Sequence, residues 1–267
     1  MFTRVFGALA VGVVALSIAP AWAGPSAEEK ARAIDIYRHI TEMDTSVEGS
    51  RVVEMAEYLA GLFKDAEFAA DDIHVIPHDK TAALVVRYRG DGSGGRPILL
   101  MAHMDVVTAH REDWERDPFK FIEEKGFFFG RGTADNKSGV AALTATFLAL
   151  RAEKFVPTRD LIIAFTGDEE TAGLTATALV REHRALIDAE FALNSDAGGG
   201  QLSEVGVPVF YGLQTAEKTF ASFKLTARNP GGHSSQPRRD NAIYDIATAL
   251  GRVRAHAFPV MWNDTTI

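Results

Sequence analysis

The sequence predicts an α/β fold in which a doubly wound, mostly parallel sheet has helices on both faces. Two short apolar segments, at residues 98–101 and 161–165, have the continuous apolar character of buried parallel strands, and a third strand is expected at residues 191–194. Segments with helical character lie between them, at residues 136–154 and 174–183. Alternation of such strands and helices is typical of a parallel sheet built from right-handed crossover units.

The segments that precede this alternation predict two helices and two strands. Residues 28–43 and 52–66 have apolar side chains at helical spacing. Residues 73–76 and 82–88 are rich in residues that favour strands, and the glycine cluster at 90–95 predicts a turn before the next strand.

The pattern changes near residue 215. Residues 219–226 alternate like a half-exposed strand, residues 229–232 interrupt it, and residues 242–253 return to helical spacing. We therefore predict one domain over residues 24–213 and the beginning of a second, α+β domain over residues 214–267. Because one strand and one helix do not bury a core, we expect this second domain to be truncated.

Residues 1–23 have the pattern of a secretory signal peptide. Arg4 provides the positive charge, residues 5–19 are apolar, and Ala21-Trp22-Ala23 matches a cleavage site. An uncleaved anchor is the alternative, but the apolar run is shorter than the roughly 20 residues of a membrane span. We expect a secreted or periplasmic protein that has no membrane segment after cleavage.

Composition limits the class of partner and of cofactor. The formal net charge of −8 argues against nucleic acid and favours a small-molecule partner. The chain contains no cysteine, so a metal ion would need histidine and carboxylate ligands, which favours zinc, manganese or cobalt.

Candidate metal ligands follow the predicted strands. His103 and Asp105 lie at the end of one strand, Glu169 and Glu170 follow the next, and Asp196 follows the third. The carboxyl edge of a parallel sheet is where such folds bind ligands. Neighbouring glutamates can divide the work between binding a metal and accepting a proton. The alternatives are a histidine satisfied by hydrogen bonds and a solvated pair of loop acids.

The glycine-rich segment at residues 130–139 allows two other interpretations. It resembles a phosphate-binding loop, but that motif needs glycine at position 136, where this chain has Asn136. Asp135 would be an ordinary helix N-cap or a metal ligand.

Several motifs together resemble the di-zinc exopeptidases of metallopeptidase family twenty, which includes glutamate carboxypeptidase, aminoacylase and succinyl-diaminopimelate desuccinylase. The resemblance runs from about residue 98 to residue 237. Its motifs are residues 101–107, Trp114 with residues 117–119, residues 130–139 and residues 165–171.

The resemblance implies a fold of the di-zinc exopeptidase type. It also implies a hydrolase of peptide or N-acyl amino-acid amide bonds, an exopeptidase similar to carboxypeptidases or dipeptidases. It implies two Zn²⁺ ions, with Co²⁺ or Mn²⁺ as substitutes, and a hydroxide shared by both ions. The implied roles are these: His103 and Asp196 hold one ion, Asp135 bridges both, Glu170 holds the second, Glu169 is the general base, and Asp105 orients His103. A cis peptide bond is also implied between Asp135 and Asn136.

Residues 231–235 resemble the motif of the family's lid domain. In this interpretation His233 reaches the active site of a partner subunit and stabilises the oxyanion, which implies a homodimer formed through the lid domain. The alternative is a simple turn with an exposed histidine.

The chain departs from the family pattern at one ligand. The second ion takes a final histidine from a segment after the lid domain, whereas His256 lies in or just past the first lid helix. We therefore expect an amino-terminal fragment of a longer enzyme. The alternative is a non-catalytic protein that keeps the fold but lacks a complete second metal site.

Overall fold

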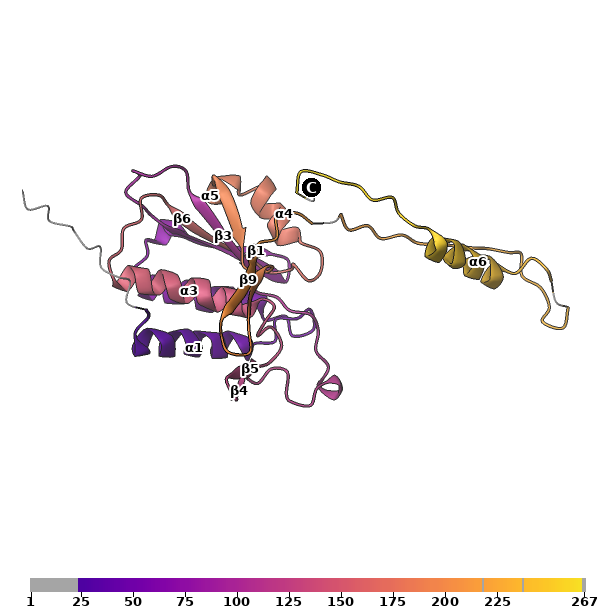
Figure 1. Cartoon of the computed structure of the whole chain (residues 1–267), viewed down its shortest axis with the longest axis horizontal. Helices are drawn as coiled ribbons and strands as arrows, with labels where there is room; N and C mark the ends of the chain where they lie inside the picture. Colours follow the sequence, from indigo (N-terminus) through magenta and orange to yellow (C-terminus); the bar gives the residue numbers. More distant parts are fainter. Residues whose placement is uncertain (1–23, 218, 237, 266–267) are drawn as a thin grey trace, which may run out of the picture. The chain divides into compact units, whose positions relative to one another are not determined.

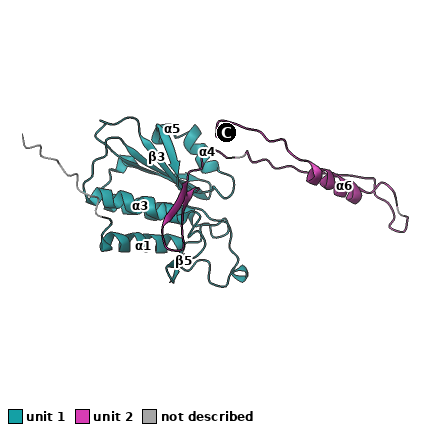
Figure 2. Cartoon of the chain, in the orientation of Figure 1, with its two compact units in different colours: residues 1–196 teal, residues 197–267 magenta. Residues whose placement is uncertain are grey.

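A computed structural model describes residues 24–217, 219–236 and 238–265. The chain divides into two compact units, residues 1–196 and residues 197–267 (Figure 2). The predicted signal peptide, residues 1–23, lies outside the described residues.

The first unit is built on a five-stranded sheet with the strand order β1-β2-β6-β3-β7. Strands β6, β3 and β7 are parallel to one another, whereas β2 is antiparallel to both β1 and β6. Four strands therefore share one direction, and the predicted mostly parallel sheet is confirmed. The strands are β1 (Ile73–His78), β2 (Thr81–Tyr88), β3 (Ile98–His103), β6 (Leu161–Thr166) and β7 (Phe191–Asn194).

Helices cover both faces of this sheet, as predicted (Figure 1). Side chains alternate along β2 and β6, so that Leu84 and Phe165 face one side while Val85 and Ala164 face the other. The larger core joins the first side to α1 (Ala27–Thr41), α2 (Val52–Asp65) and α3 (Lys137–Ala152). The smaller core joins the second side to α4 (Leu174–Arg181) and α5 (Arg184–Ile187).

Short elements in the first unit were not predicted from the sequence. A hairpin joins β4 (Ile122–Glu124) to β5 (Phe127–Phe129), and two 3-10 helices occur, η1 (Ala70–Asp72) and η2 (Arg111–Asp113). Lys125 and Gly126 both have positive φ, at 53° and 81°, as a tight hairpin turn requires. The Lys-Gly pair directly before the apolar run at residues 127–129 was a signal for this hairpin.

The second unit contains the hairpin β8 (Gly199–Leu202) with β9 (Pro208–Gly212) and the helix α6 (Ala242–Ala255). The predicted helix at residues 242–253 is confirmed, but the predicted strand at residues 219–226 is wrong, because the structure has no strand there. Alternating side chains form a strand only where another strand supplies hydrogen bonds and one face is buried. Phe220 and Phe223 are instead 89% and 88% exposed. The predicted domain boundary near residue 213 stays a prediction.

Among the helices in the described part of the chain, none is long and apolar enough to cross a bilayer.

Candidate metal centre

The parallel strands bring the predicted site residues to one edge of the sheet. His103 is the last residue of β3, and its register partner Thr166 is the last residue of β6. On the other side of β3, Met101 pairs with Asn194 at the end of β7. The loops that follow these three strands therefore start side by side, although they are far apart in the sequence.

Four carboxylates gather around the imidazole of His103. Its Nε2 atom lies 2.8 Å from Asp135 Oδ1 and 3.7 Å from Asp196 Oδ1. Two groups of side chains, His103 with Asp135 and Glu170, and His103 with Glu169 and Asp196, each offer ligand atoms within 4.8 Å of one another. His103, Glu169, Glu170 and Asp196, which follow three strands, thus meet Asp135 from the glycine-rich loop.

This donor set suits a divalent metal ion. It combines one imidazole with several carboxylate oxygens, the ligands that zinc, manganese and cobalt accept in proteins. Carboxylates this close repel one another unless protons or a cation compensate their charge. The residues present therefore fit the predicted kind of cofactor, while the identity and number of ions stay predictions.

Asp105 connects the histidine to the glutamate pair. Its carboxylate is buried, with Oδ1 accepting the backbone N–H of Glu169 at 3.1 Å and Oδ2 accepting that of Glu170 at 2.9 Å. His103 Nδ1 lies 3.0 Å from the Asp105 backbone oxygen and 3.4 Å from Asp105 Oδ1. The sequence predicted the contact with His103 but not the two backbone hydrogen bonds, which hold the loop of the glutamates.

The electrostatics of the metal-free site reflect this crowding of acids. Burial acts to lower the pKa of His103, but hydrogen bonds with Asp105 and Asp135 and the attraction of Asp105 and Asp196 outweigh it and raise the pKa to about 9. The pKa values of Glu169 and Glu170 are both raised, first by burial and then by the neighbouring acids, against the opposing effect of His103. A raised pKa suits a carboxylate that must accept a proton near neutral pH.

Asp135 is not the N-cap of α3. The cap position belongs to Asn136, whose side chain forms no capping hydrogen bond, while the Asp135 carboxylate contacts His103. The peptide bond between Asp135 and Asn136 is cis, as the family resemblance implied.

A close contact joins the loops that contain Asp135 and Asp196. Ser195 Oγ lies 3.0 Å from the Met101 oxygen, to which it donates, and 3.3 Å from Asn136 Oδ1. A Cβ atom at Gly139 would lie 2.2 Å from both Asn136 Oδ1 and Ser195 Oγ, so only glycine fits there. Sequence reasoning missed this contact, although a glycine inside a predicted helix was a signal for it.

His233 belongs to the second unit and is exposed. Its Nδ1 atom lies 2.8 Å from Ser235 Oγ, and the backbone N–H of Ser235 donates to the same nitrogen at 3.3 Å. The predicted role of His233 in a partner subunit stays a prediction.

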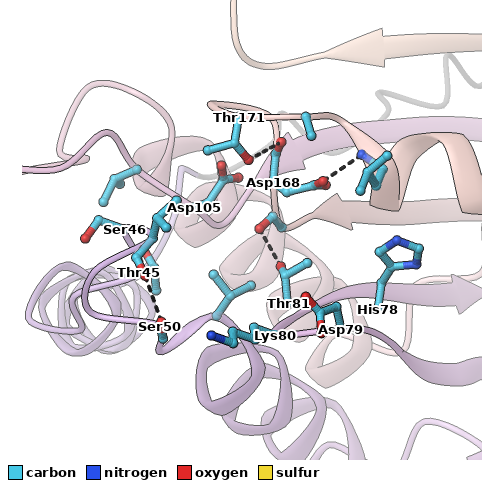
Figure 3. A pocket seen from close by; sticks show the side chains of 16 residues that line it. Thr45, Ser46, Ser50, His78, Asp79, Lys80, Thr81, Asp105, Asp168 and Thr171 are labelled. Atoms are coloured by element: carbon cyan, nitrogen blue, oxygen red, sulfur yellow. Dashed lines mark hydrogen bonds between the residues drawn. The ribbon is translucent and has the colours of Figure 1, made fainter.

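A cavity of about 240 Å³ adjoins Asp105 in the first unit. Figure 3 shows Asp105 and Ser46 on one side of it and His78 and Asp79 on another. Asp105 is the one predicted site residue in its lining, so the cavity borders the positioning carboxylate rather than the candidate ligands. Its volume is below the roughly 300 Å³ at which ligand pockets begin.

Comparison with known proteins agrees with this geometry. The model of peptidase family M20/M25/M40 matches residues 99–265. The human N-fatty-acyl-amino acid synthase/hydrolase PM20D1 is 29% identical over 81% of this chain and 43% of its own length. A probable succinyl-diaminopimelate desuccinylase of Staphylococcus aureus (strain Mu50 / ATCC 700699) is 32% identical over 79% of this chain and 48% of its own length. The chain spans less than half the length of these relatives.

Solved structures support the same fold. The di-peptidase Dug1p from Saccharomyces cerevisiae matches with a TM-score of 0.56 and 20% identity, over 66% of this chain and 40% of its own. The M20 family metallo-carboxypeptidase Sso-CP2 from Sulfolobus solfataricus matches with a TM-score of 0.55 and 17% identity, over 68% of this chain and 39% of its own. Because the family model covers most of the sequence, the chain belongs to peptidase family M20/M25/M40.

Proposed function

We propose that the full-length protein is a metal-dependent hydrolase of amide bonds in peptides or N-acyl amino acids, acting as an exopeptidase of the carboxypeptidase or dipeptidase kind. The observation that supports this most is the meeting of His103 with four carboxylates at the carboxyl edge of the sheet. Membership of the family and the names of the relatives, which include peptidases and hydrolases of acylated amino acids, support the same class of reaction.

The proposed cofactor is a pair of Zn²⁺ ions, which Co²⁺ or Mn²⁺ could replace. In this proposal His103 and Asp196 would hold one ion, Glu170 would hold the other, and Asp135 would contribute to both. Bound ions of this kind polarise a substrate carbonyl and lower the pKa of a coordinated water.

Glu169 is the proposed general base. Its raised pKa and its position beside the candidate ligands suit a carboxylate that takes a proton from the attacking water. The same carboxyl group then gives that proton to the departing amine nitrogen. Asp105 acts indirectly, because it holds both His103 and the backbone of the glutamate loop.

We further propose that residues 1–23 direct export to the periplasm or the exterior, and that the protein forms a homodimer through the domain that begins with residues 214–267. His233 would then stabilise the oxyanion in the partner subunit's site. These proposals rest on sequence motifs, and each has its own test: sequencing of the mature amino terminus for export, and light scattering for the dimer.

The activity test compares wild type with Glu169→Gln on a panel of dipeptides and N-acyl amino acids, including N-succinyl and N-fatty-acyl compounds. The variant keeps the size of the side chain but removes the base, so kcat should fall about 10²- to 10⁴-fold while metal content stays the same. Glu182→Gln, at an exposed position of the first unit, is the matched control and should behave as wild type.

Undiminished turnover in Glu169→Gln would contradict the assignment of the base. A wild-type protein that binds metal but hydrolyses no member of the panel would favour the alternative of a non-catalytic protein with the same fold.

A further inference from the structure

A lysine that the proposed reaction does not use is buried beside the metal centre. Lys137 is the first residue of α3, two positions after Asp135, and its side chain is fully buried. Its Nζ atom donates to the backbone oxygen of Met43 at 2.6 Å. Burying an ammonium group is costly, so a lysine in such a position needs a structural or functional reason.

The side chain of Lys137 runs beneath the loop that contains Asp135. Its backbone N–H donates to the Gly132 oxygen at 2.9 Å. A Cβ atom at Gly132 would lie 2.9 Å from Lys137 Cδ and 3.1 Å from its Cγ, so the aliphatic stem lies against the loop backbone. The stem thus supports the loop, and the ammonium fixes its end to the segment that follows α1.

A second hydrogen bond joins the same loop to α1. The hydroxyl of Tyr37 donates to the backbone oxygen of Thr133. Two edge-to-face contacts hold the Tyr37 ring in place. Its centroid lies 5.1 Å from the ring centroid of Phe121 and 5.5 Å from that of Phe128. The aromatic neighbours leave the phenol little freedom, so the hydroxyl gives the loop a fixed point of attachment.

The hydrogen bond from Tyr37 holds the loop at Thr133, before Asp135 in the sequence, and the hydrogen bond to Met43 holds it at Lys137, after Asp135. The two bonds therefore define the path of the loop. We propose that this pair, called here the α1 tether, positions the Asp135 carboxylate against His103 for metal binding. Lys137 and Tyr37 are then positioning residues, which act through Asp135 and touch neither substrate nor metal. The inference rests on the proposed function.

The test measures Co²⁺ binding to the metal-free full-length protein by calorimetry and by visible absorption. Wild type should bind two equivalents. In Lys137→Met, which keeps the stem but removes the donor, we expect at least one equivalent to bind ten- to a hundredfold more weakly, with a changed cobalt spectrum. Tyr37→Phe removes one hydroxyl and should shift both readouts in the same direction by a smaller factor.

Two control variants separate positioning from general stability. Lys64→Met removes an exposed lysine of α2 and should match wild type. Leu59→Ala opens the buried core at α2, at a residue that forms neither hydrogen bond of the tether, and should lower the melting temperature without changing cobalt affinity or spectrum in the folded protein.

The inference would be overturned if folded Lys137→Met and Tyr37→Phe bound cobalt with the affinity and spectrum of wild type. It would also be overturned if their loss of cobalt affinity were no larger than that of Leu59→Ala. If Lys137→Met shows no cooperative melting, Tyr37→Phe decides by the same criterion. A wild-type protein that binds no cobalt would overturn the proposed function itself, so the two failures are distinguishable.

Discussion

Asp105 shows how one side chain organises a site without belonging to the candidate ligands. Its two carboxylate oxygens each accept a backbone N–H from the glutamate loop, and its backbone oxygen accepts the imidazole Nδ1 contact. A neutral amide of the same shape has one acceptor oxygen only, so it would direct an NH₂ group at one of the loop N–H groups.

We therefore expect Asp105→Asn to disturb the glutamate loop and lower metal affinity or kcat about 10- to 100-fold, the usual effect of losing an outer hydrogen-bond partner. Calorimetric metal titration and steady-state kinetics measure it. Asp113→Asn, at an exposed position, is the control and should have the metal affinity and kcat of wild type. Equal affinity and kcat in wild type and Asp105→Asn would contradict this role.

The raised pKa of His103 predicts a pH dependence of metal binding. In the metal-free protein the histidine pKa rises from 6.5 to about 9, so protonation of His103 stabilises the folded state below pH 6.5 and that contribution disappears as the pH rises through about 9. A metal ion needs the unprotonated nitrogen, so its apparent affinity should increase with pH over the same interval.

Calorimetry in buffers of different ionisation enthalpy, at a pH between these two values, should detect proton release on metal binding. The His103→Gln variant should release fewer protons and bind metal more weakly. Metal binding without proton release would show that the imidazole is already unprotonated and would contradict the raised pKa.

At the scale of elements, the site depends on how closely α3 approaches the loop after β7. No residue larger than glycine fits at position 139, because Asn136 and Ser195 occupy the space that a side chain would fill. Alanine normally favours a helix interior over glycine by roughly 0.5–1 kcal/mol, but here the clash should dominate.

We expect Gly139→Ala to lower the free energy of unfolding by about 1–3 kcal/mol, the usual cost of overpacking, and to weaken metal binding by displacing Ser195 and Asp196. Gly61→Ala is the matched comparison, because a Cβ atom at Gly61 in α2 has open space around it. That variant should gain about 0.5–1 kcal/mol. Urea unfolding measures both, and a gain in stability for Gly139→Ala would contradict the packing argument.

The elements show which parts of the fold the sequence could predict. Strands β3 and β6 were recognisable because buried strands require continuous apolar residues. Strand β7 is exposed, and it was recognisable from its place after a helix in the alternation of strands and helices. The ends of all three strands identified candidate ligands. The hairpin β8 and β9 was missed because Gly199 and Gly200 are typical of a loop. The antiparallel direction of β2 depends on pairing partners far away in the sequence, which periodicity does not reveal.

At the scale of the whole molecule, the two units differ in burial. The first has two buried apolar cores, whereas no described residue of 197–267 is buried. Large apolar side chains of the second unit are exposed, including Phe223 at 88% and Val205 at 85%. Burial of apolar surface is the main favourable contribution to folding.

We therefore predict that residues 24–196, expressed alone, unfold cooperatively in urea, whereas residues 197–267 alone show a gradual, non-cooperative change. Circular dichroism during urea titration measures both. A sharp unfolding transition for residues 197–267 would contradict this difference between the units.

The proposal that two metal ions bind at the carboxyl edge of the sheet has a decisive test. Crystals of the full-length protein grown with zinc would be measured with X-rays at energies just above and below the zinc absorption edge. We predict two anomalous peaks about 3.5–4 Å apart, one beside His103 and Asp196, the other beside Glu170, with Asp135 between them. Zinc bound elsewhere, or no peak at this edge at saturating zinc, would contradict the proposed metal centre.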